Sequence, residues 1–190
     1  MSHMNKKAAV FISGIGNDIC SPFFDDTGKL NIVYQNSGSI KMINSVGNTQ
    51  NVCNTNGHPS GACFGADGAY FTLNNSTNFC FLTAISILGV LYVADFGHAA
   101  ILAVRSDGQQ ELVVGVYEDK PLKGPNSIYI SNGDIFFTDS GTFGETGLHS
   151  ATGSLFTISN SPSGQILKPI SLGNLAYPSG IAVSFDGKFM

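Results

Sequence analysis

A phrase that recurs along the chain constrains its fold more than any other feature. The segments GVLYVADFG (89–97) and GDIFFTDSG (133–141) share one pattern of glycine, apolar residues, aspartate and a closing glycine. A second phrase occurs three times, as HPSGACFGADG from His58, GPNSIYISNG from Gly124 and YPSGIAVSFDG from Tyr177. Each of these contains a proline, small or polar residues, alternating apolar positions, and then Asp-Gly or Asn-Gly. The chain therefore repeats one structural unit.

The repeated unit is predicted to be a β-hairpin. Pro125 fixes its own φ and disfavours helix in the residue before it, so the following segment is entered in an extended conformation. Asn132-Gly133 predicts a tight turn. The copies continue into further strands, expected at 99–104 and 154–159, and a more degenerate copy occupies residues 20–43. Four strands repeating every 40 to 50 residues or so is the period of a β-propeller blade.

The repeat predicts an all-β fold, a β-propeller of four-stranded antiparallel blades. A sandwich is the alternative, but it does not require the same phrase at the head of every fourth strand. A content of 43% hydrophobic residues over 190 residues is enough for one sizeable core. The predicted blades are 17–57, 58–120, 121–175 and a truncated 176–190, about three and a third of a probable six. Residues 1–4 look like an expression scar, and 5–190 form a single partial propeller domain.

About three and a third blades cannot close a propeller ring. A strand edge and one side of the core are expected to be exposed unless more protein or another copy covers them. Self-association through the open blade edges is therefore one expectation.

The second blade carries an insertion at about 69–89. The distance from Pro59 to Asp95 is about 22 residues longer than that from Pro125 to Asp139, and the extra stretch has no charged residue. It could be a long hairpin, an interaction element, or a translated insertion foreign to the parent fold. The abrupt change in composition favours the last. The apolar run 79–94 is shorter than the roughly 20 residues of a membrane-spanning helix, so no membrane span is predicted.

Charge and cysteine content exclude some classes of function. A net charge of −4 with nine Lys and Arg offers no basic surface for nucleic acid. The cysteines are widely and irregularly spaced, which argues against a zinc site and a disulfide framework and predicts free thiols: Cys20, Cys53, Cys63 and Cys80.

The apolar run at 8–15 predicts a first strand rather than a signal peptide, because Ser13 and Gly14 interrupt it. Without a clear signal peptide or a disulfide framework, a cytoplasmic location is favoured.

The segments GPNSIYISNGDIFFTDSG followed by GSLFTI, and LAYPSGIAVSFDGKF, carry a family resemblance. They resemble the six-bladed propellers of the gluconolactonase, regucalcin, paraoxonase and strictosidine synthase-like superfamily, with the closest phrasing in the strictosidine synthase-like branch. The resemblance covers most of residues 20–190 apart from the insertion. It implies Ca²⁺ or another divalent cation at the top of the central channel, held by oxygen ligands at the heads of the innermost strands.

Asn126 occupies the position of the family's metal or substrate asparagine and is the candidate metal ligand. The equivalent asparagine of the next blade falls at Ser179, the first-blade glutamate falls near Cys20, and the remaining acidic ligand would lie beyond Met190. Neither Ser179 nor Cys20 supplies a carboxylate or an amide, which puts metal binding in question. A turn role for Asn126 is the alternative, because asparagine side chains readily hydrogen-bond nearby backbone.

Other polar residues are expected to be structural. Asp95 and Asp139 end strands before a Gly and could tie down the next turn. Three histidines in different blades are expected to be exposed loop residues, because no nucleophile elbow or matched acid accompanies them: His58, His98 and His149. No catalytic residue is assigned, and no nucleotide-binding motif is present.

Three functions remain open at this point. The first is a calcium-dependent hydrolase of lactones or related esters, in which the ion would polarise the carbonyl of a small-molecule substrate. The alternative is a non-catalytic propeller that binds a protein or a small ligand. The third is an aberrant or truncated product without activity of its own.

Overall fold

A computed structural model describes residues 10–25, 27–44, 47–65, 89–142, 144–145, 149–184 and 188–190. The predicted insertion lies outside the described residues except for Gly89. Every regular element in the described part of the chain is a β-strand, and no helix there is long and apolar enough to cross a membrane.

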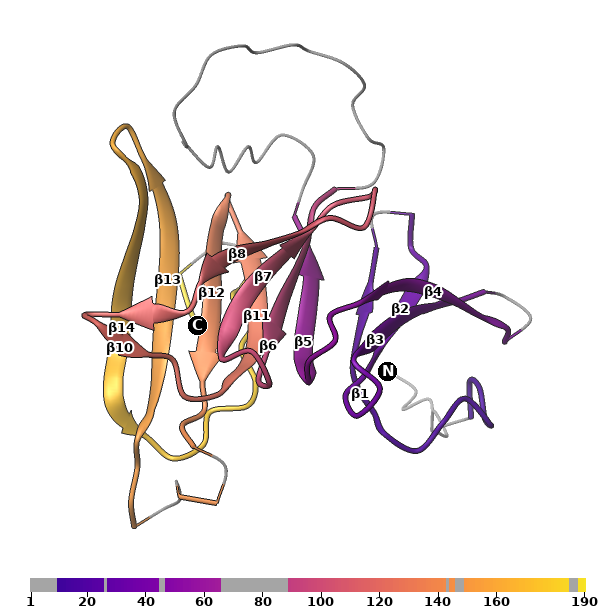
Figure 1. Ribbon diagram of the computed structural model, residues 1–190, viewed down its shortest axis with the longest axis horizontal. Helices are drawn as coiled ribbons and strands as arrows, with labels where there is room; N and C mark the ends of the chain where they lie inside the picture. The colour runs from indigo at the N-terminus through magenta and orange to yellow at the C-terminus, as the bar shows by residue number, and fades with distance from the viewer. Residues whose placement is uncertain are drawn as a thin grey trace, which may run out of the picture.

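Three four-stranded antiparallel sheets follow one another along the chain (Figure 1). Sheet one has the order β1 (Ile19–Phe24), β2 (Leu30–Tyr34), β3 (Ser39–Ile43) and β4 (Thr49–Asn54). Sheet two has the order β5 (Pro59–Phe64), β6 (Leu91–Asp95), β7 (Ala100–Val104) and β8 (Gln110–Val114). Sheet three has the order β11 (Pro125–Ser131), β12 (Asp134–Asp139), β13 (Gly153–Ser161) and β14 (Gly164–Leu175).

Each sheet is a meander, because strands that are neighbours in the sequence are neighbours in the sheet. A two-stranded ribbon of β9 (Val116–Tyr117) and β10 (Lys120–Pro121) connects sheet two to sheet three. The predicted turn between β11 and β12 is present, with Asn132 and Gly133 at φ values of 51° and 83°. These backbone angles suit a tight hairpin turn and favour Asn and Gly. We call the three sheets blades 1, 2 and 3.

The first strand of each blade lies next to the first strand of the following blade. β5 contacts β1 on one side and β11 on the other. The inner strands therefore line a common hub, and each sheet extends outward from it to its last strand, which is β4, β8 or β14. The three sheets and their strands are labelled in Figure 1. This arrangement is the partial β-propeller that the repeat predicts. In residues 176–184 and 188–190, where a fourth blade is expected to begin, the structure has no strand.

Blade 2 is covered on both of its faces. Tyr92 and Ala94 point towards blade 3, whereas Val93 points towards blade 1. All residues of β6 and β7 are buried. The apolar runs LYVA and AILAV are therefore continuous rather than alternating, as expected for strands covered on both sides.

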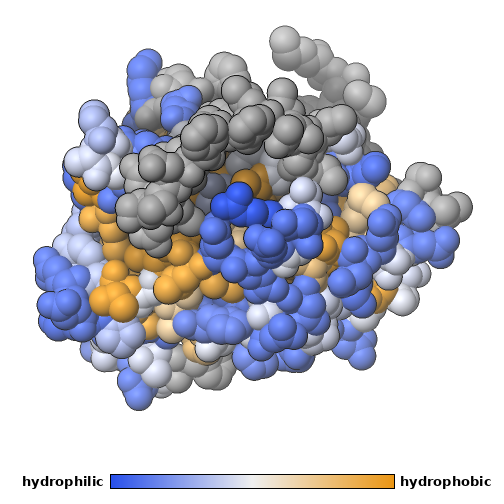
Figure 2. Space-filling view, turned by 45° about the horizontal axis from the view of Figure 1, so that its top comes forward, coloured by the Kyte–Doolittle hydropathy of each residue, from blue (hydrophilic) through white to orange (hydrophobic). Residues whose placement is uncertain are grey.

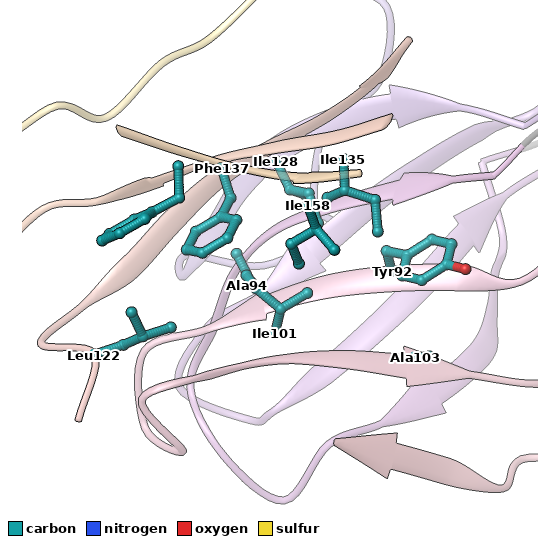
Figure 3. Close-up of a cluster of buried hydrophobic side chains, with 10 residues drawn as sticks. Tyr92, Ala94, Ile101, Ala103, Leu122, Ile128, Ile135, Phe137 and Ile158 are labelled. Carbon is teal, nitrogen blue, oxygen red and sulfur yellow. The ribbon is translucent and has the colours of Figure 1, made fainter. Parts of the chain in front are cut away.

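The larger core cluster lies between blades 2 and 3 (Figure 3). Phe137 is fully buried there and stacks on Phe156 with ring centroids 5.3 Å apart. A second cluster between blades 1 and 2 is centred on Val33, Ile40 and Cys53. Burial of these side chains is the main force that holds neighbouring blades together.

The predicted strand at 8–15 is wrong for the residues that the structure describes. Residues 10–15 form no strand, and Gly14 has a φ of 75° that breaks an extended run. Ile12 and Ile15 instead pack against the face of blade 1 that is turned away from blade 2, where Tyr34 is buried. Val10 and Phe11 are 83% and 81% exposed, so only part of this apolar run covers the blade.

The outer strands carry exposed apolar side chains. Leu112 on β8 is 61% exposed, and Ile170 and Leu172 on β14 are 49% and 53% exposed. Apolar residues are visible among the polar ones on the face shown in Figure 2. Both strands are the last in their sheets, so one edge of each has no neighbouring strand in the described part of the chain.

Candidate functional site

A pocket of about 330 Å³ lies at the hub, at the end of the inner strands. Its lining residues come from all three blades and from the segment that follows blade 3. They are Cys20, Ser21, Gln35, Ser60, Phe96, Asn126, Tyr177 and Ser179. The pocket therefore unites parts of the chain that are far apart in the sequence.

The blade repeat explains why these residues meet. Pro59 pairs with Asp95 in blade 2, and Pro125 pairs with Asp139 in blade 3. Ser60 and Asn126, which directly follow these prolines, thus occupy equivalent positions. Ser179 follows Pro178 in the same phrase. Each copy of the phrase directs one polar side chain to the same pocket.

The three positions singled out from the sequence, Cys20, Asn126 and Ser179, line this one pocket. Lining the pocket does not by itself establish a chemical role for these three residues. Sequence reasoning missed Ser60, although the shared Pro-Ser phrase would have revealed it by comparison with Pro125-Asn126. It also missed Gln35, Phe96 and Tyr177, for which the sequence gives no comparable signal.

Ser60 accepts hydrogen bonds from three side chains of blade 1. The Cys20 thiol donates to the Ser60 carbonyl oxygen over 3.6 Å, and the Ser21 hydroxyl donates to the same oxygen. Gln35 Nε2 donates to Ser60 Oγ over 3.2 Å. We call this group the Ser60 cluster. It joins blade 1 to blade 2 at the edge of the pocket.

The other side of the pocket has unpaired polar groups. Asn126, Tyr177 and Ser179 make no side-chain hydrogen bond in the described part of the structure, and all three are at least partly exposed. Their amide and hydroxyl groups are therefore available to a molecule in the pocket.

Two lining residues adopt a left-handed backbone conformation. Ser21 has a φ of 42° and Tyr177 a φ of 49°. Such conformations cost roughly 1–2 kcal/mol for residues other than glycine. Strain of this kind concentrates at functional sites. Here it accompanies the placement of a hydroxyl and an aromatic ring at the pocket wall.

The Cys20 thiol is held in its neutral form. Burial raises the pKa of Cys20, the hydrogen bond with Ser21 opposes this, and the nearby charge of Asp18 adds to the rise. A neutral thiol is a poor nucleophile and a poor metal ligand. Cys20, Cys53 and Cys63 are all free, and Cys80 lies outside the described residues.

Asp95 and Asp139 hold the loops that lead into their blades. The Asp139 carboxylate accepts backbone N–H groups of Lys123 at 3.0 Å and Gly124 at 2.5 Å. Asp95 Oδ1 accepts those of His58 at 2.9 Å and His98 at 3.1 Å. These contacts agree with the structural role predicted for both aspartates.

The three histidines lie on the surface. His58 and His98 flank Asp95, and Nδ1 of His98 is 3.3 Å from Asp95 Oδ2. His149 is exposed. None of them lines the pocket.

The residues of the pocket do not fit a divalent cation. Calcium is bound by six to eight oxygen ligands that normally include carboxylates. The lining residues offer hydroxyls, amides and a neutral thiol, and none is Asp or Glu. In the described part of the chain, no group of three or more His, Cys, Asp or Glu side chains is arranged to hold a metal ion.

The sequence matches no family model, and a search of curated proteins finds no match. Solved structures are similar. A gluconolactonase from Xanthomonas campestris has a TM-score of 0.66 and 21% identity, over 90% of this chain and 52% of the other. A protein assigned as a gluconolactonase has a TM-score of 0.62 and 16% identity, over 89% and 53%. Virginiamycin B lyase from Staphylococcus aureus has a TM-score of 0.56 and 17% identity, over 90% and 47%.

These similarities confirm the fold that the sequence resemblance implies, a part of a β-propeller. At identities below a quarter they show the fold alone. The chain spans about half the length of these solved structures.

Proposed function

We propose that the hub pocket binds a small uncharged molecule and that lactones or related esters are its substrate class. The observation that carries this proposal is the convergence of neutral polar side chains from every copy of the repeat on one pocket. A volume of about 330 Å³ suits a small molecule. The fold shared with gluconolactonases supports the choice of substrate class.

The free groups of the pocket suit a carbonyl compound. A carbonyl oxygen there could accept hydrogen bonds from the Asn126 amide and the Ser179 hydroxyl. Donors aimed at such an oxygen stabilise the negative charge that develops on it during hydrolysis.

The test is a hydrolysis assay with a panel of small lactones and esters on the whole protein. Turnover that falls at least tenfold in Asn126→Ala would support the proposal. Calcium dependence, which the sequence resemblance implies, is measured in the same assay by adding calcium or a chelator. The absence of both binding and turnover for the whole panel would refute the proposal.

A non-catalytic binding propeller is the second candidate. It is favoured by the lining residues themselves, which include no carboxylate and no histidine, and by the neutral thiol of Cys20. Without such groups the described part of the pocket offers no general base. Saturable binding of a lactone without turnover would support this candidate over the hydrolase.

A further inference from the structure

We infer that the part of the hub pocket lined by the described residues binds its ligand without a divalent cation: hydrogen bonds between blades hold one side of the pocket, and Asn126, Tyr177 and Ser179 contact the ligand directly. This inference rests on the proposed small-molecule function of the pocket. It concerns how the site is held together and which residues it leaves for the ligand.

The pocket wall has no charged side chain. A divalent cation leaving water needs negative ligands to offset its lost hydration. The lining side chains carry no charge, since the thiol of Cys20 stays protonated and the others are hydroxyl, amide or aromatic groups. An uncharged ligand with hydrogen-bonding groups loses far less on leaving water and finds partners here.

The polar side chains of blade 1 that line the pocket already have hydrogen-bond partners. Cys20 and Ser21 both donate to the Ser60 carbonyl, and Gln35 donates to the Ser60 hydroxyl. An ion bound at the hub would tie neighbouring blades together. The Ser60 cluster does this with neutral hydrogen bonds between residues 25 to 40 positions apart.

The two sides of the pocket differ in whether their polar side chains have hydrogen-bond partners. The side formed by blades 1 and 2 is occupied by the Ser60 cluster, whereas Asn126, Tyr177 and Ser179 have no side-chain partner among the described residues. The left-handed backbone of Tyr177 holds its ring at the wall. The ligand therefore meets the blade 3 side, and the opposite side serves as a fixed support.

The experiment is a pair of titrations of the whole protein, followed by NMR through the side-chain amide signals of Asn126. Calcium chloride is the first probe and γ-butyrolactone the second. We expect no saturable shift with calcium up to millimolar concentrations and a saturable shift with the lactone. Saturable calcium binding that moves the Asn126 amide signals would overturn the inference.

A variant provides the positive control. Cys20→Glu combined with Ser179→Asn restores the acidic and amide residues that the family resemblance places there, and we expect it to gain measurable calcium binding by calorimetry. If the unaltered protein binds calcium as tightly as this variant, the inference is wrong.

Stability measurements test the supporting side. Gln35→Ala should lower the melting temperature more than it weakens lactone binding, whereas Asn126→Ala should weaken lactone binding at least tenfold with little change in melting temperature. The reverse pattern would overturn the division between the two sides. A protein that responds neither to lactone nor to calcium contradicts the proposed function and leaves the cation-free hub supported, so the two failures are distinguishable.

Discussion

The repeated blade motif contains Pro-Ser-Gly at residues 59–61 and again at 178–180, and these two copies lie in different surroundings. Ser60 is buried and accepts a hydrogen bond from Gln35, whereas Ser179 is exposed and has no side-chain partner among the described residues. A Cβ added to Gly61 would lie 2.5 Å from the carbonyl oxygen of Asn126, whereas one added to Gly180 would meet nothing within 4 Å.

The role of a repeated residue therefore depends on whether the following blade packs against it. Blade 3 packs on β5, so the first copy has become part of a blade contact. No described strand packs in the same way on the second copy. Identical local sequence therefore yields a structural position in one place and an open binding position in the other.

The largest expected difference between the copies is at glycine. Gly61→Ala should lower the free energy of unfolding by about 3 kcal/mol, because its methyl group collides with backbone that cannot move aside. Gly180→Ala should change it by less than about 0.5 kcal/mol. Urea unfolding of both variants measures the difference, and equal effects would break the comparison.

The third copy of the phrase, at Pro125, depends on the aspartate with which that proline pairs. Asp139→Asn should cost about 2 kcal/mol, because the partly buried N–H group of Lys123 and the buried one of Gly124 lose a charged acceptor. Asp119→Asn is the matched control on the surface and should be neutral within about 0.5 kcal/mol. A neutral Asp139→Asn would show that the loop before β11 is held by other contacts.

Alkaline pH should weaken the contact between blades 1 and 2. Burial raises the pKa of the Cys53 thiol from 9.0 to about 11. The neutral thiol is thus favoured in the folded state, and its contribution is fully present below pH 9 and lost as the pH rises towards 11. At pH 10 the loss should be about 1.4 kcal/mol.

The measurement is the free energy of unfolding between pH 7 and pH 10. Cys53→Ala should be less stable throughout, since it leaves a cavity, but its stability should fall less over this range. Parallel curves for the two proteins would contradict the assignment to Cys53.

The smallest expected difference is at serine. Ser60→Ala should destabilise by about 1 kcal/mol through loss of the Gln35 hydrogen bond. Ser179→Ala should leave stability unchanged and affect ligand binding alone. Thermal unfolding with and without a small lactone separates the two effects, and a stable Ser60→Ala would weaken the case for the Ser60 cluster.

Much of the fold was predictable from the sequence because the blade is a local structure. Pro125, Asn132-Gly133 and Asp139 all act on residues near them in the chain or across one hairpin. The family resemblance singled out Asn126, Ser179 and Cys20 together. The contacts between blades could not be predicted from these local patterns. The bonds to Ser60 come from residues 25 to 40 positions away, and no local pattern encodes them.

The role of the apolar segment before blade 1 was not predictable for a similar reason. The apolar run at residues 8–15 was predicted to be a strand, but the partners of Ile12 and Ile15 are side chains on another element. Hydrophobicity did not show which side chains of this run are covered or by what, since Val10 and Phe11 are exposed. The position of Tyr177 at the pocket likewise depends on a backbone angle that its sequence does not suggest.

The unequal connections within the blades bear on the order in which the chain acquires its structure. Two residues join β11 to β12, whereas 26 residues separate Phe64 of β5 from Leu91 of β6. Closing the longer connection costs roughly 2 kcal/mol more in chain entropy. During folding, the three strands β6 to β8 can therefore associate first, and β5 joins them late, together with the neighbours on which it depends.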